Sequence, residues 1–136
     1  MRAVVLDNEA VHALRTPRHA KHRTVLAHLE GVAHRRRKGA SVIAVVPTAV
    51  RVEAGWDRTE PASAVINRFR VGDRSLDTSA ADVAATIHAR TSKGVADSHV
   101  GATVRGLPDD DVVILSSDPG DMTLVSSPRA ITAVQI

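Results

Sequence analysis

The stretch Ala3-Val4-Val5-Leu6, with Asp7 directly after it, decides the fold that the sequence predicts. No polar residue interrupts these four apolar residues, which is typical of a strand buried on both faces in a parallel sheet. Two later β-branched runs, Ser41 to Val46 and Val112 to Leu115, alternate with stretches of helical periodicity. The alternation predicts an α/β fold whose mostly parallel strands are joined by crossover helices.

The rest of the chain fills in around these strands. The pattern predicts a helical segment that Pro17 closes, an amphipathic helix from Arg18 to Lys38, a helix beginning at Pro47, a helix over Pro61–Phe69, an extended stretch over Val71–Leu76, a helix capped by Thr78 or Ser79 that Gly94 ends, a helix beginning near Asp97, and a terminal strand over Ala130–Ile136. We expect the acidic run 109–111 to lie in a solvated loop. No repeat or long linker divides residues 1–136, so the sequence predicts a single domain.

Composition excludes several classes of protein. Hydrophobic residues make up 43% of the chain and charged residues 24%, which is too apolar for a disordered protein. Trp56 and Phe69 are the only aromatic residues, which argues against a platform that stacks single-stranded bases, and the lack of cysteine excludes disulfides and zinc–sulfur sites. The longest apolar run, Ala40 to Val50, is 11 residues long and contains Pro47, so it is too short to cross a membrane. The expectation is a cytoplasmic protein.

Positive charge gathers in the first half of the chain. Residues 1–58 carry 11 Lys and Arg against 5 Asp and Glu, whereas residues 59–136 carry 7 against 10. Between residues 12 and 38, eight basic residues stand against Glu30 alone, together with five of the seven histidines. Such a face is either the electrostatic footprint of a polyanion partner such as nucleic acid or a well-solvated outer helix face.

Four acidic residues are candidates for chemistry, because ligands of open parallel sheets bind at the carboxyl ends of the strands. Asp7 ends the first strand, Asp118 follows the last internal strand, and Asp97 opens a helix. Each of these has a structural alternative: Asp97 and Asp118 suit helix caps, the latter because Pro119 follows it, and Asp7 suits a turn. Glu53 lies four residues after Ala49, which predicts a carboxylate on the apolar side of its helix.

Convergence is what distinguishes a site from a set of caps. The predicted topology brings Asp7, Glu53, Asp97 and Asp118 towards one edge of the sheet. Four carboxylates in one place raise each other's pKa unless a cation neutralises them. Oxygen ligands without cysteine favour Mg²⁺ or Mn²⁺.

These residues lie in segments that resemble a known family. The segments are Val4-Val5-Leu6-Asp7, Val52-Glu53-Ala54-Gly55, Val95-Ala96-Asp97-Ser98-His99-Val100-Gly101-Ala102 and Val113-Ile114-Leu115-Ser116-Ser117-Asp118-Pro119-Gly120-Asp121. In this order and spacing, the sequence resembles PIN-domain proteins, specifically the VapC-type toxin ribonucleases of toxin–antitoxin modules. The resemblance spans nearly the whole chain and implies a three-layer α/β/α sandwich.

The resemblance also implies a function. Asp7, Glu53, Asp97 and Asp118 would bind Mg²⁺ or Mn²⁺ for phosphodiester hydrolysis, with Ser116 and Asp121 as auxiliary residues. It further implies a structured RNA substrate such as tRNA, a small cognate antitoxin and a homodimer. The RNA backbone would contact the basic residues Arg15, Arg18, Lys21, Arg23, Arg35, Arg36, Arg37 and Lys38. His99 has no required role and is expected to be a surface or packing residue.

Two other functional classes compete with the ribonuclease. One is a non-catalytic PIN-like module that binds RNA or a protein partner through the basic helix 18–38 and keeps its acids as caps. The other is a doubly wound phosphoacceptor domain, which would normally need a lysine after its last strand. The sequence has no lysine after Lys93, so this class ranks low.

Overall fold

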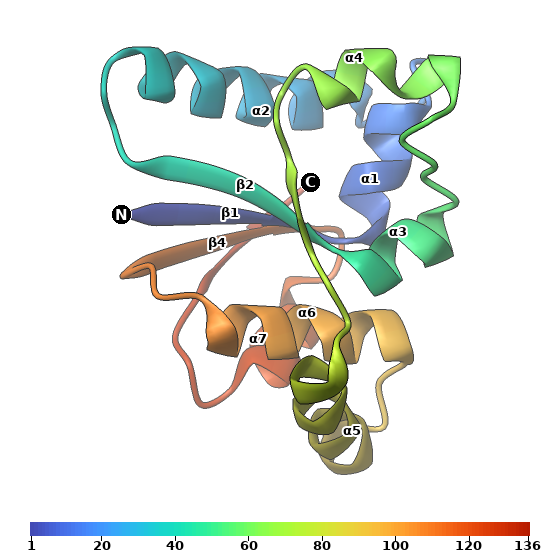
Figure 1. Cartoon of the computed structure of the whole chain (residues 1–136), viewed down its shortest axis with the longest axis vertical. Helices are drawn as coiled ribbons and strands as arrows, with labels where there is room; N and C mark the ends of the chain where they lie inside the picture. The colour runs from blue at the N-terminus through green and yellow to red at the C-terminus, as the bar shows by residue number, and fades with distance from the viewer.

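The computed structural model describes residues 1–136 and contains one sheet of five parallel strands with helices on both faces. The strand order is β3-β2-β1-β4-β5, so the first strand of the chain is the central one. In Figure 1, α1, α2 and α4 cover one face and α5, α6 and α7 cover the other, which is a three-layer α/β/α arrangement. The α/β prediction is therefore confirmed.

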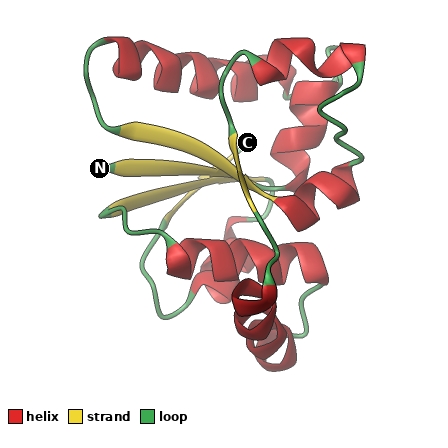
Figure 2. Ribbon diagram, in the orientation of Figure 1, coloured by secondary structure: helices red, strands yellow, loops and turns green.

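One or two α-helices separate each strand of the chain from the next, and Figure 2 shows the strands in one sheet with the helices around it. The strands are β1 (Arg2–Leu6), β2 (Val42–Pro47), β3 (Gly72–Arg74), β4 (Asp111–Ser116) and β5 (Thr132–Gln135). The helices are α1 (Asn8–Arg15), α2 (His22–Arg37), α3 (Thr48–Ala54), α4 (Ala64–Asn67), α5 (Thr78–Thr91), α6 (Val95–Gly106) and α7 (Pro119–Ser126), with a short 3-10 turn, Pro61–Ser63, before α4. None of these helices has the length and apolar character needed to span a membrane.

The core is aliphatic and lies on both faces of the three middle strands. The last four residues of β1 are buried, as the uninterrupted apolar run predicts. On one face α6 is almost wholly buried and packs against α5 and α7. Gly101 makes this packing possible, because a Cβ at that position would lie 2.3 Å from the carbonyl oxygen of Val125 on α7. Between the layers, α3 contacts both α1 and α6 at the carboxyl edge of the sheet.

Several predicted boundaries were wrong. The cap of α5 is Asp77, whose side chain accepts a hydrogen bond from the Ala80 amide, so neither Thr78 nor Ser79 caps it. Ser92, in a left-handed conformation, ends α5, while Gly94 is the N-cap of α6. The helix expected near Asp97 thus begins two residues earlier, at Val95.

The prediction of a solvated loop at residues 109–111 is also only partly correct. Asp110 is exposed, but Asp109 is 1% exposed and its two carboxylate oxygens have no hydrogen-bond partner. Its backbone carbonyl accepts from the Arg129 guanidinium, which also bonds to the carbonyl of Leu107. This guanidinium draws the loop onto the protein and buries Asp109 with it.

Candidate functional site

The predicted acidic residues lie at the carboxyl edge of the sheet, around the point where the chain changes direction. From β1 the chain goes to β2 and β3 on one side, and it later returns to β4 on the other side of β1. The loops that follow β1 and β4 therefore diverge, which leaves room for a ligand between them. Asp7 follows β1 and Asp118 follows β4, so both stand at this switch point.

Asp7 is the most firmly held of these residues. It is 6% exposed and is the N-cap of α1. Its Oδ1 accepts from the Asn8 amide at 2.7 Å and its Oδ2 accepts from the Ser116 hydroxyl at 2.8 Å. Burial raises the pKa of Asp7, against the opposing effect of these hydrogen bonds, and the charges of Asp118 and Asp121 raise it further.

Ser116 links the two sides of the switch point. Besides donating to Asp7, its Oγ accepts from the Asp118 amide at 3.0 Å. The Asp118 side chain in turn accepts from the Asp121 amide at 3.1 Å and caps α7, which confirms the capping expected of Asp118 before Pro119. Asp118 is exposed, so a carboxylate oxygen is still open to solvent.

Asp97 is affected both by burial and by its acidic neighbours. It lies in the first turn of α6 and is half-buried, and it does not cap the helix because Gly94 holds that position. Burial is the largest cause that raises its pKa to about 6, followed by the charges of Asp7, Asp121 and Glu53. Asp97 therefore lies within electrostatic reach of acids from three other segments of the chain.

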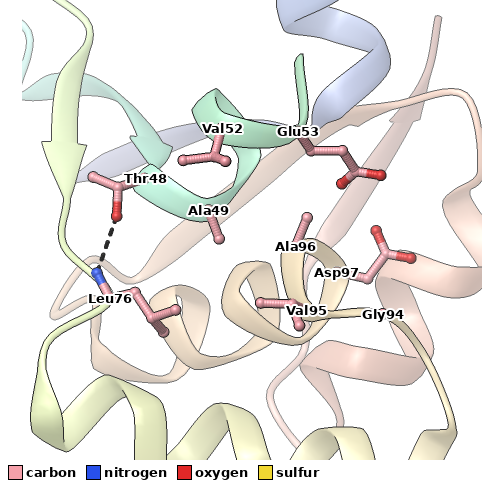
Figure 3. Close-up of a pocket in the computed structure, with 9 residues that line it drawn as sticks. All are labelled: Thr48, Ala49, Val52, Glu53, Leu76, Gly94, Val95, Ala96 and Asp97. Carbon is pink, nitrogen blue, oxygen red and sulfur yellow. Dashed lines mark hydrogen bonds between the residues drawn. The ribbon is translucent and has the colours of Figure 1, made fainter. Parts of the chain in front are cut away.

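Glu53 corrects one of the predictions. It is exposed on α3 and does not face the core, and its neighbour Val52 is 81% exposed. Trp56 is buried, but it lies beyond Gly55, which ends this short helix. As Figure 3 shows, the Glu53 carboxylate extends towards that of Asp97 across one end of a groove.

The groove itself was not predicted. It has a volume of about 630 Å³ and runs between α3, the start of α6 and the chain after β3. Its walls include Val52, Val95 and Leu76, which are among the exposed large apolar residues of the molecule. The signal in the sequence was ambiguous, because an apolar residue on a short helix is expected in the core as readily as in a groove.

A lysine also lies among the acids, and sequence reasoning assigned it no role. The Nζ of Lys93, in the loop between α5 and α6, is 2.8 Å from the Oδ1 of Asp121. This hydrogen bond raises the pKa of Lys93, and the charges of Asp121, Asp118 and Asp97 raise it further. Its position four residues before Asp97 was the available signal.

The fit of these residues to a divalent cation has two sides. The donors are carboxylate and hydroxyl oxygens, which suit Mg²⁺ or Mn²⁺, and the group that they attract in this structure is a cation, the Lys93 ammonium. However, no three His, Cys, Asp or Glu side chains are positioned to hold one metal ion together. The chemistry of the site thus suits a divalent ion, while its side chains stand outside a coordination geometry.

The basic residues do not form one surface next to these acids. Arg15 and Arg36 have structural partners: Arg15 donates to the Ala54 carbonyl at 2.6 Å, and Arg36 donates to those of Val42 and Phe69 at 2.9 and 3.0 Å. Lys21 is half-buried and 4.0 Å from Glu9. The exposed basic residues are Arg18, Arg23, Arg35, Arg37 and Lys38.

Their position in the fold also differs from the acidic site. The end of α2 leads into the start of β2, so 35–38 lie near the amino edge of the sheet, opposite the acids (Figure 1).

His99 is confirmed as a packing residue. It is 1% exposed, and its Nδ1 accepts from the Ala49 amide at 3.3 Å. Burial lowers its pKa. Its side chain therefore packs between α6 and α3.

The comparisons with known proteins add no family to this description. The chain matches no protein-family model and no curated protein sequence.

Proposed function

We propose that this protein is a divalent-metal-dependent endoribonuclease, the toxin of a VapBC-like toxin–antitoxin pair. The observation that carries the proposal is the acidic edge of the sheet: Asp7 and Asp118 at the switch point, with Asp97 drawn to a pKa of about 6 by burial and by its acidic neighbours. Clustered acids that oppose each other's ionisation favour a cation as their partner. The resemblance of the sequence segments around these acids to PIN domains supports the same function.

The residues have separate roles in this proposal. Asp7 and Asp97 would hold Mg²⁺ or Mn²⁺, with Glu53 and Asp118 as further ligands or as acceptors that orient the attacking water. When bound, the metal lowers the pKa of a water and neutralises charge on the phosphate. Ser116 is a positioning residue, because its hydroxyl fixes Asp7 on one side and the Asp118 backbone on the other.

The structure adds one condition to this role of the acids. Since no three of them now share an ion-binding geometry, Asp97 and Glu53 must turn towards Asp7 when a metal binds. Glu53 is exposed and Asp97 is half-buried, so both side chains reach solvent and have room to turn. Asp7, by contrast, is held in place by its two hydrogen bonds.

The substrate and partners belong to the same proposal. The substrate is RNA, with structured RNA such as tRNA as the first candidate, and its phosphates would contact two exposed basic residues, Arg18 in the turn before α2 and Arg23 in the first turn of α2. A small antitoxin would cover the acidic edge, and the enzyme would act as a homodimer in the cytoplasm.

Two observations favour a second function. The capping role of Asp118 and the absence of a three-donor metal geometry are both as expected for a non-catalytic module that binds RNA or a protein through α2. Such a module would need the exposed arginines of α2 and would not need Asp97.

Cleavage of RNA distinguishes the two functions. Purified protein, free of any antitoxin, is incubated with total RNA, and separately with DNA, in Mg²⁺, Mn²⁺ or EDTA. The controls are Asp97→Asn and Asp82→Asn, the second being an exposed aspartate on α5. The ribonuclease proposal expects cleavage that needs the metal and Asp97 but not Asp82. A folded protein that cleaves RNA in no metal would favour the binding module.

A further inference from the structure

Lys93 is the one basic side chain that lies among the acids at the carboxyl edge. Its Nζ is 2.8 Å from Asp121, and the charges of Asp118 and Asp97 also act on it. The proposed metal-dependent hydrolysis of RNA gives this lysine no role. The Lys93 and Asp121 side chains are 32% and 29% exposed, and an ion pair that solvent reaches in this way adds little to stability. The position of Lys93 is therefore better explained by the acidic site than by stability.

The loop presents this side chain in a defined place. The Lys93 amide donates to the Thr91 hydroxyl at 3.2 Å, and its carbonyl accepts from the Ser98 hydroxyl at 3.4 Å and from the His88 ring. These bonds tie the residue to the end of α5 and the start of α6. The backbone of Lys93 is therefore fixed between the two helices, and its ammonium lies beside the acids through the contact with Asp121.

We propose that Lys93 is an intrinsic counter-ion of the acidic site, which a divalent cation must displace from Asp121 in order to bind. The inference rests on the proposed function, because it assumes that the acids take up Mg²⁺ or Mn²⁺. An ammonium and a divalent cation compete for the same carboxylates, and their mutual repulsion lowers the affinity of the metal. Lys93 thus sets the metal concentration at which the site fills, and it partly neutralises the acids when no metal is bound.

The test is a calorimetric titration of the metal-free protein with Mn²⁺. Lys93→Met removes the charge and keeps an unbranched apolar side chain, whereas Lys93→Arg keeps the charge. Lys38→Met is the matched control, since it removes one positive charge from an exposed residue at the opposite edge of the sheet. Unfolding in urea and far-ultraviolet circular dichroism establish that each variant folds as the parent does.

The expected result is Mn²⁺ binding roughly tenfold tighter in Lys93→Met than in the parent, because a unit charge a few ångströms from a divalent ion has an effect of this order in water. Lys93→Arg and Lys38→Met should bind within about threefold of the parent. Unchanged or weaker binding by Lys93→Met would overturn the inference.

Asp97→Asn separates this inference from the proposed function. If the parent binds Mn²⁺ and Asp97→Asn does not, the metal site stands, and Lys93→Met alone decides the role of the lysine. Binding seen only in Lys93→Met would support the counter-ion strongly. If neither the parent nor Lys93→Met binds Mn²⁺, both the metal site and the counter-ion are refuted.

Discussion

Replacing Asp97 by asparagine is expected to stabilise the metal-free protein at neutral pH, although it should abolish the proposed ribonuclease activity. The pKa of Asp97 in the folded protein is about 6, above its ordinary value of 3.8. The folded state therefore binds the proton more tightly than the unfolded state does. As the pH rises from 3.8 towards 6, ionisation of Asp97 removes stability, and above that range the full destabilisation is present. Asparagine cannot ionise, so the variant avoids this loss.

The size of the effect follows from the shift in pKa. A difference of about two pKa units between the folded and unfolded states corresponds to at most about 3 kcal/mol. Asp97 is half-buried, so solvent screening reduces this to roughly 1–2 kcal/mol. For a domain of this size the melting temperature should rise by on the order of 5 °C.

The assay is urea and thermal unfolding of the parent and Asp97→Asn in EDTA, at about pH 4 and about pH 7.5. The stabilisation should be present at the higher pH and absent at the lower. Asp82→Asn, on the exposed side of α5, corrects for the general effect of removing one negative charge. An Asp97→Asn variant that is no more stable than the parent at the higher pH, or equally stabilised at both, would refute the electrostatic description of the site. If the proposed metal site exists, saturating Mn²⁺ should make the parent more stable than Asp97→Asn, because the metal stabilises only the protein that binds it.

Two further predictions concern the fold. Gly101→Ala should lower the free energy of unfolding by about 1–3 kcal/mol, since the new Cβ would lie 2.3 Å from the carbonyl oxygen of Val125. Gly106→Ala, in the same helix, is the control and should be tolerated, because a Cβ there has open space. Urea unfolding of both variants checks this prediction. Arg36→Ala should lower the melting temperature, because Arg36 donates hydrogen bonds to two backbone carbonyls. Arg37→Ala should not lower it, because Arg37 is exposed. Equal melting temperatures of the two variants would contradict the structural role of Arg36.

The buried strands and the N-cap of α7 were predicted well from the sequence, whereas the caps of α5 and α6 were not. The uninterrupted apolar run Ala3–Leu6 lies in the central strand, because a strand covered on both faces lacks polar positions. Asp118 before Pro119 is a helix N-cap, since both residue types are suited to those two positions. Such local signals depend on a few neighbouring atoms, and tertiary packing did not override them.

The prediction for Glu53 failed because periodicity describes a helix and not its surroundings. The spacing from Ala49 does place the two residues on neighbouring parts of α3, but α3 is only seven residues long and part of its apolar surface lines a groove. Whether an apolar stripe meets the core or a groove depends on what packs against it, which a single helix does not encode.

Lys93 and Asp109 show a second limit of prediction from sequence, which concerns loop residues. The position of Lys93 follows from hydrogen bonds that its own backbone makes with α5 and α6, and that of Asp109 from a guanidinium 20 residues away. Neither arrangement has a periodic pattern. Loop residues of this kind can be assigned a charge from the sequence but not a partner.

The order of the strands also has a consequence for how the protein is made. The β1 strand is synthesised first, but it pairs with residues 42–45 on one side and 111–115 on the other. The bond between Ser116 and Asp7 joins residues 109 positions apart, which a ribosome takes on the order of 5–20 s to bridge. A nascent chain that has not reached β4 lacks one of the two strands that pair with β1, and it lacks the hydroxyl that fixes Asp7. For the proposed ribonuclease, the acidic site would therefore be assembled only when translation of these residues is almost complete, so that unfinished chains would leave the RNA of the producing cell uncut.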